Sequence, residues 1–312
     1  MNNAEPLKNS LDENPSAEKA SWRDYYEMCK PNVVMMMIVT SIIGMFLAVP
    51  GMVPLDALIL GNVGIALCAG SAAAVNHLLD RRFDQHMART HNRPIAKGRV
   101  EPMQAIIFSS VLGLIGMAIL LFGVNAITAW LTLASLLGYA FVYTLFLKHA
   151  TPQNIVIGGL AGAAPPLLGW TAVTGEIHHH ALLLVLIIFA WTPPHFWALA
   201  VYRKVEYAKV NIPMLPVTHG AKYTKIHILL YTLILFAVTL LPYATGMLSW
   251  LYLIGAIVLG LGFLFCAIRM IVIDKPTTGR DTFHYSNIYL LAMFIIMLAD
   301  HYLLPVQQVV SL

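Results

Sequence analysis

The sequence has few charged side chains: Asp, Glu, Lys and Arg make up 11% of its 312 residues. A soluble globular domain carries about 25% charged residues. Hydrophobic residues make up 59% of the chain, and its mean hydropathy is +0.73. This balance excludes an ordinary soluble core and predicts a protein that spans the lipid bilayer several times.

Cysteine is also scarce. The chain has three, Cys29, Cys68 and Cys266, scattered in or beside apolar segments, which predicts neither a disulfide framework nor a cysteine metal cluster.

The first 30 residues lack the apolar stretch of a secretory signal, and they contain more acids than a mitochondrial transit peptide. We interpret 1–30 as a polar cytoplasmic extension with a short interfacial helix around 22–28, and we expect a bacterial plasma (inner) membrane.

The rest of the chain is organised as long apolar runs. A helix needs about 20 apolar residues to cross the hydrocarbon layer. Nine segments meet this length: 32–50, 57–78, 102–122, 126–147, 153–173, 181–201, 223–243, 247–268 and 283–303. No inserted soluble domain separates them. We therefore predict an all-α integral membrane protein, with nine transmembrane helices in one bundle and a single membrane domain over 31–312.

The basic residues predict how this bundle is oriented. If the N-terminus is cytoplasmic, all 19 Lys and Arg residues fall in the N-terminal extension or in loops on the same side. Cytoplasmic segments of membrane proteins are enriched in Lys and Arg. We therefore expect the C-terminus on the outer side. Topology also explains the net charge of +4, and we expect no nucleic-acid partner.

Charge is concentrated where the second apolar segment ends, in "NHLLDRRFD". Asn76, Asp80 and Asp84 are spaced i, i+4, i+8, so a continued helix places them on one face. Carboxylates near a helix C-terminus oppose the helix dipole, and a divalent cation would make them favourable. Mg²⁺ commonly bridges carboxylates to substrate phosphates. The downstream cations suit such phosphates, and they are Arg89, Arg93, Lys97 and Arg99.

A second charged loop follows the sixth segment. Tyr202, Glu206 and Lys209 share a face if that helix continues, and Arg203 and Tyr207 stand beside them. Earlier in the same segment, His195 follows two prolines inside the apolar run, and an ionisable group at membrane depth is a functional candidate. By contrast, the run 178–180, three consecutive histidines on an outer loop, is interpreted as a solvated turn rather than a metal cluster.

These motifs resemble the UbiA superfamily of intramembrane prenyltransferases. The superfamily resemblance lies in "NHLLDRRFD" and the acid-containing sixth loop. The similarity to its heme-farnesylating members lies in "MARTHNRPIAKGRV", "WTPPHFWALAVYRKVEYAKVNIPMLPVTHG" and "FHYSNIYL". It implies a nine-helix bundle around a central cavity that opens to the cytoplasm. It also implies transfer of a farnesyl group from farnesyl diphosphate to the 2-vinyl group of heme B, giving heme O.

The resemblance also implies roles for individual residues. Asn76, Asp80 and Asp84 would hold Mg²⁺. Together with Arg89 and Arg93, the two aspartates would carry catalysis. The diphosphate would be bound by Asn76, Arg89, Arg93, Lys97, Arg203 and Lys209. The heme acceptor would lie near His195, Tyr202, Glu206 and Tyr207, with His195 a candidate iron ligand. Many relatives have two acids in the sixth loop, whereas this chain offers only Glu206, which leaves a second Mg²⁺ open.

Three other functions stay open at this point. A related prenyltransferase could act on a hydroxybenzoate or quinone precursor. A transporter would also have many helices and broken segments. A structural subunit of an oxidase assembly would use its charges for topology alone. Candidate partners beyond the substrates and the lipid bilayer are heme A synthase and an oxidase assembly.

Overall fold

The computed structural model describes residues 20–85, 90–147, 151–209, 213–273 and 275–304. Within these ranges all regular structure is helical, as the apolar runs predict. The elements are α1 (Trp22–Met28), α2 (Pro31–Leu47), the π-helix η1 (Ala57–Gly61), α3 (Asn62–Asp84), α4 (Pro102–Gly123), α5 (Ala126–Leu137), the π-helix η2 (Gly138–Leu147), α7 (Asn154–Ala163), α8 (Pro165–Thr174), α9 (His179–Tyr202), α10 (Lys204–Lys209), α11 (Leu215–Thr218), α12 (Gly220–Ala244), α13 (Trp250–Val272) and α14 (Pro276–Leu303).

Eight helices or helix pairs in the described ranges are long and apolar enough to cross a membrane. A ninth candidate span is the pair α1 and α2, which meet at an angle of 52°. Each predicted segment therefore has a helical counterpart, and the expected interfacial helix is α1. Large apolar side chains face outward along the bundle, for example Leu114 and Phe122, which are 71% and 85% exposed. Such a surface is stable in lipid and not in water.

Two spans are interrupted in ways that periodicity does not reveal. The fourth predicted segment begins as the α-helix α5 and widens into the π-helix η2. The fifth is divided into α7 and α8 at Ala164, because Pro165 lacks an N–H and starts a new helix at its first position. In contrast, α9 stays helical through Pro193 and Pro194.

Small residues allow the helices to approach closely. A Cβ on Gly44 of α2 would collide with the backbone of Pro166, and one on Gly169 of α8 would collide with the backbone of Ser41. Close backbone approach of this kind is how membrane helices pack without a hydrophobic driving force from water. The largest buried cluster lies between α9, α12, α13 and α14, and it contains Leu184, Tyr252, Phe263 and Tyr289.

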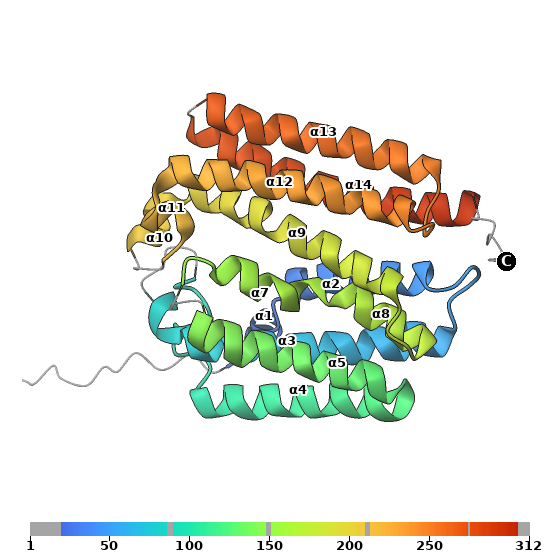
Figure 1. Cartoon of the computed structure of the whole chain (residues 1–312). Helices are drawn as coiled ribbons and strands as arrows, with labels where there is room; N and C mark the ends of the chain where they lie inside the picture. The colour runs from blue at the N-terminus through green and yellow to red at the C-terminus, as the bar shows by residue number, and fades with distance from the viewer. Residues whose placement is uncertain (1–19, 86–89, 148–150, 210–212, 274, 305–312) are drawn as a thin grey trace, which may run out of the picture.

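The two ends of the bundle differ in what they carry (Figure 1). At one end α3 stops at Asp84, and α1, α10 and α11 lie near it. At the other end lie the short connection from α8 into α9 and the C-terminal end of α14. Which end faces the cytoplasm stays a prediction from the basic residues.

Candidate active site

The last two turns of α3 form a buried polar cluster. Asn76, Asp80 and Asp84 are 4%, 3% and 3% exposed, on successive turns of one helix face as their spacing predicts. The amide Nδ2 of Asn76 donates to Asp80 Oδ2 at 2.9 Å and to the hydroxyl of Thr144, on η2, at 3.3 Å. Buried carboxylates are costly unless they are paired or hydrogen-bonded. The cluster therefore needs cations close to it.

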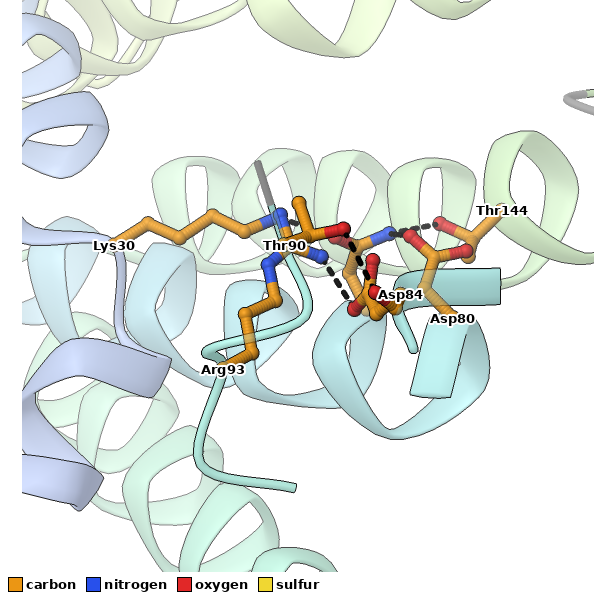
Figure 2. A network of polar contacts seen from close by, with 7 residues as sticks. Lys30, Asp80, Asp84, Thr90, Arg93 and Thr144 are labelled. Carbon is orange, nitrogen blue, oxygen red and sulfur yellow. Dashed lines mark hydrogen bonds and ion pairs between the residues drawn. The ribbon is translucent and has the colours of Figure 1, made fainter. Parts of the chain in front are cut away.

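Two cations reach this cluster, as Figure 2 shows: Arg93 points at Asp84, and Lys30 extends into the same group of polar side chains. Arg93, in the loop after α3, places Nη1 2.6 Å from Asp84 Oδ2. The Thr90 hydroxyl of the same loop donates to the backbone carbonyl of Asp84 at 3.3 Å. From another direction, Lys30 donates its Nζ to Asn76 Oδ1. The loop and the N-terminal segment thus converge on the end of α3.

Lys30 was not among the predicted site residues, because in the sequence it serves only as one of the topology-setting cations. It precedes Pro31 at the bend between α1 and α2 and has a left-handed backbone φ of 51°, which residues other than glycine rarely adopt. A strained backbone of this kind persists only where the surrounding structure holds it. The bend directs Lys30 toward Asn76, where the sequence alone indicated no contact.

The structure holds this bend through Arg99. Its guanidinium lies 2.9 Å from Asp24 and 3.8 Å from Glu27, both on α1. Asp24 also forms a capping box with Ser21 at the start of α1. Arg99 was grouped with the phosphate-binding cations, but in the structure it fastens α1 to the loop after α3.

The π-helix η2 adds aromatic groups beside the acids. Tyr139 and Tyr143 stack with ring centroids 5.6 Å apart, on the same π-helix as Thr144, which contacts Asn76. Single π-helical turns in α-helices are frequent at functional sites. No signal in the sequence distinguishes this turn from an ordinary helix.

The remaining predicted residues of the second loop are arranged differently from the expectation. The backbone breaks at Arg203, so Tyr202 ends α9 whereas Glu206 and Lys209 belong to α10, and the common face of one continuous helix is not formed. Arg203 lies 3.7 Å from Glu206. Lys209, like Lys97 of the first loop, is exposed. Arg89 lies outside the described residues.

His195 is buried between two helices. Its ring lies between Trp191 at 4.0 Å and Phe283 at 4.5 Å, centroid to centroid. The Ser286 hydroxyl on α14 donates its single hydrogen to the Phe283 carbonyl at 2.6 Å, so it accepts from His195 Nδ1, also at 2.6 Å. The bond from Ser286 to the Phe283 carbonyl favours the tautomer with the proton on Nδ1. Within the described part of the chain no group hydrogen-bonds Nε2, whose lone pair is available to a ligand.

Comparison with known proteins agrees with this architecture. Residues 37–296 match the model of the UbiA prenyltransferase family. The chain belongs to the UbiA prenyltransferase family. It is 72% identical to a protein of Saccharophagus degradans named protoheme IX farnesyltransferase, over 92% of this chain and 94% of that one. The prediction of the family from the four motifs is confirmed.

Solved structures support the UbiA fold. A digeranylgeranylglyceryl phosphate synthase superposes with a TM-score of 0.78 at 16% identity, covering 90% of this chain and 99% of that one. A UbiA homologue from Archaeoglobus fulgidus bound to GPP and Mg²⁺ gives a TM-score of 0.61 at 14% identity, over 88% and 99%. Identities this low establish the helical architecture alone.

The donor set of this UbiA-family chain fits a hard divalent cation. Asn76, Asp80 and Asp84 offer amide and carboxylate oxygens from three successive turns, and Mg²⁺ binds through one or two carboxylates plus substrate phosphates. Lys30 and Arg93 offset the two aspartates in charge, so the cluster does not repel an incoming polyanion. An anion that brings its own metal, such as a magnesium diphosphate, matches this arrangement of oxygens and cations.

Proposed function

We propose that this chain transfers a farnesyl group from farnesyl diphosphate to the 2-vinyl group of heme B, with addition of water, to give heme O and diphosphate. The Saccharophagus degradans protein that is 72% identical to this chain is named protoheme IX farnesyltransferase, and this name supports the proposed reaction. The buried pair Asp80 and Asp84, with Lys30 and Arg93 beside it, is the structural observation that carries the proposal.

The donor half of the proposed site binds the diphosphate. Asn76, Asp80 and Asp84 would hold Mg²⁺, which when bound supplies electrostatic stabilisation of charge on the leaving oxygen. Arg93 would pair with phosphate oxygens through its planar guanidinium, and Lys30 would add a second positive charge from the N-terminal segment. We include Arg89, Lys97, Arg203 and Lys209 as further diphosphate-binding cations that approach once the substrate is present.

The acceptor half of the proposed site binds heme. We propose that His195 binds the heme iron through Nε2, in the tautomer that donates from Nδ1 to the Ser286 hydroxyl. Metal-ligating histidines usually donate their other ring nitrogen in this way. Tyr202, Glu206 and Tyr207 stand at the end of α9 and on α10, and we propose that they contact the polar edge of the porphyrin.

The reaction proceeds by heterolysis of the allylic C–O bond. Diphosphate leaves with the electron pair, stabilised by Lys30 and Arg93, and the farnesyl carbon becomes electrophilic. The heme vinyl π bond attacks this carbon and forms the new C–C bond. Water then adds to the cation next to the porphyrin ring and loses a proton, which gives the hydroxyl of heme O. The apolar bundle excludes water until that last step.

The location follows from the same topology. We propose that the protein lies in a bacterial inner membrane and that its site faces the cytoplasm. Both substrates would reach the site from the lipid or from the membrane surface. The polar residues 1–30 would form an extension, of which α1 rests on the membrane domain 31–312. Heme A synthase or an oxidase assembly would receive the product.

One experiment tests the proposal directly. Purified membranes containing the protein are incubated with heme B, farnesyl diphosphate and Mg²⁺, and the extracted heme is analysed by mass. We expect heme O, with no product when a chelator is present and restoration by added Mg²⁺. A prenylated quinone precursor made under matched conditions, with heme B unchanged, would refute the heme assignment and leave the prenyltransferase assignment standing.

A further inference from the structure

Three consecutive histidines lie at the end of the bundle opposite the aspartates. α8 ends at Thr174 and is capped by Gly175, whose φ is 71°. The chain then turns into α9 through the extended residue His178, at φ −98° and ψ 148°. His179 and His180 are then the first residues of α9. The backbone therefore changes from extended to helical within the run of three histidines.

The three imidazole rings converge. Their centroids lie 4.0 Å (His178 to His179), 4.2 Å (His179 to His180) and 4.7 Å (His178 to His180) apart. Each ring offers one nitrogen, and these three nitrogens all lie within 4.8 Å of one another. The buried Trp170 stacks on His178 with an interplanar angle of 2° and holds that ring in place. A solvated turn, as the sequence suggests, would have no reason to gather these rings.

The imidazole nitrogens of the three histidines form few hydrogen bonds with the described residues. Nε2 of His180 is buried, and it has no hydrogen-bond partner in the part of the chain that the structure describes. Nδ1 of His178 accepts the backbone N–H of His180 at 3.3 Å, at the long end of the range.

We propose that His178, His179 and His180 bind one late first-row divalent cation, Zn²⁺ or Cu²⁺, with water at the remaining position. Imidazole is the preferred neutral ligand of these metals, and three histidines plus water form a common four-coordinate set. Zn–N bonds of about 2.0–2.1 Å require the nitrogens to close from their present spacing, which rotation of the side chains achieves. This site is independent of the proposed heme chemistry.

Metal binding by the purified full-length protein tests the proposal. The chain carries no histidine tag, is stripped with chelator, and is titrated with Zn²⁺ in detergent with excess Mg²⁺ to occupy the aspartate site. We expect one Zn²⁺ per chain by calorimetry, and Co²⁺ to give the intense visible absorption of a four-coordinate imidazole site. Affinity should fall as the pH is lowered, because protonated rings cannot bind metal.

Substitutions distinguish this site from other histidines. His178→Ala with His180→Ala should weaken Zn²⁺ binding at least tenfold, and His219→Ala, which removes an exposed histidine elsewhere, should leave it unchanged. His178→Asn with His180→Gln serves if the alanine variant does not fold. Equal Zn²⁺ binding by wild type and the folded double variant, or no bound Zn²⁺ in wild type, would overturn the proposal. Neither result bears on heme O formation.

Discussion

The two ends of the bundle bury carboxylates in contrasting ways. At one end Asp80 accepts from the Asn76 amide, which also contacts Lys30, and Asp84 pairs with the tip of Arg93. At the other, the fully buried Asp300 of α14 accepts from the backbone N–H groups of Ser249 and Tyr252 at 2.7 and 2.9 Å, and from the Ser249 hydroxyl at 2.6 Å.

This contrast separates a structural carboxylate from one available for chemistry. Asp300 satisfies the free N–H groups at the start of α13, where Ser249 makes no cap with its own side chain. Its partners are fixed by the backbone, so a ligand cannot replace them without unfolding the helix end. Lys30 and Arg93 can instead turn their charges onto a substrate anion and leave the aspartate oxygens to a metal. Burial alone therefore does not identify a functional acid.

The largest expected effect is a loss of turnover when Asp80, at the first of these two ends, is changed. Asp80→Asn keeps the shape of the side chain and removes its charge, so metal affinity and leaving-group stabilisation are both lost. Turnover should fall by about 10²–10³-fold, and the free energy of unfolding should change by less than about 1 kcal/mol. Initial rates of heme O formation and thermal unfolding in detergent measure the two quantities.

The matched control for Asp80→Asn is Asp281→Asn. Asp281 lies at the same end of the bundle, where it pairs with Arg269 at 3.8 Å and Arg280 at 3.6 Å on the surface. Exposed ion pairs contribute little, so its activity should stay within about twofold of wild type. Equal loss of activity in both variants would mean that the charge of Asp80 has no special role.

The second prediction concerns Asp300, at the other end of the bundle, where a substitution should lower stability and not activity. Asp300→Ala leaves two backbone N–H groups and a hydroxyl without their acceptor, which should destabilise the protein by roughly 3 kcal/mol. Activity of the remaining folded protein at low temperature should be close to wild type. Asp300→Asn keeps one acceptor oxygen and should lose less. A stable but inactive Asp300→Ala protein would contradict the division between the two ends.

Much of the fold was predictable from the sequence because membrane spans are selected by length and apolarity, which are local properties. The shared face of Asn76, Asp80 and Asp84 was predictable for a similar reason, since helical spacing alone fixes it. Residues that reach the site from distant segments were not predictable. Lys30 contacts Asn76 only because the chain bends at its left-handed backbone, and no periodicity signals such a bend.

Two other features were missed for related physical reasons. Asp300 is one acid near the end of the ninth predicted segment, and its role depends on where α13 begins in space. The run 178–180 was interpreted as a solvated turn because consecutive residues rarely share one metal, whereas one extended residue before the helix brings the three rings together. In both cases the deciding quantity is a three-dimensional angle that composition and spacing do not contain.

The third prediction tests whether Lys30, at the aspartate end of the bundle, binds the diphosphate. Lys30→Ala removes one charge-assisted contact to the diphosphate, worth about 1.5–3 kcal/mol, so the KM for farnesyl diphosphate should rise at least about tenfold. Lys30→Arg should recover part of this loss. Lys275→Ala, at an exposed lysine before α14, is the control and should behave as wild type. An unchanged KM in Lys30→Ala would show that Lys30 only anchors the helix bend.

The smallest expected effect concerns Ser286, which touches neither aspartate. Without its hydroxyl, His195 no longer has an acceptor that fixes the proton on Nδ1, and a single such hydrogen bond contributes about 1 kcal/mol. Ser286→Ala should therefore lower turnover with heme roughly three- to tenfold and shift the absorption bands of bound heme B, with KM for farnesyl diphosphate unchanged. Ser286→Thr restores a hydroxyl and should restore both readouts. If Ser286→Ala instead raised the KM for farnesyl diphosphate and left the heme spectrum alone, then His195 would act on the donor side, and the assignment of the α9–α14 interface to heme would fail.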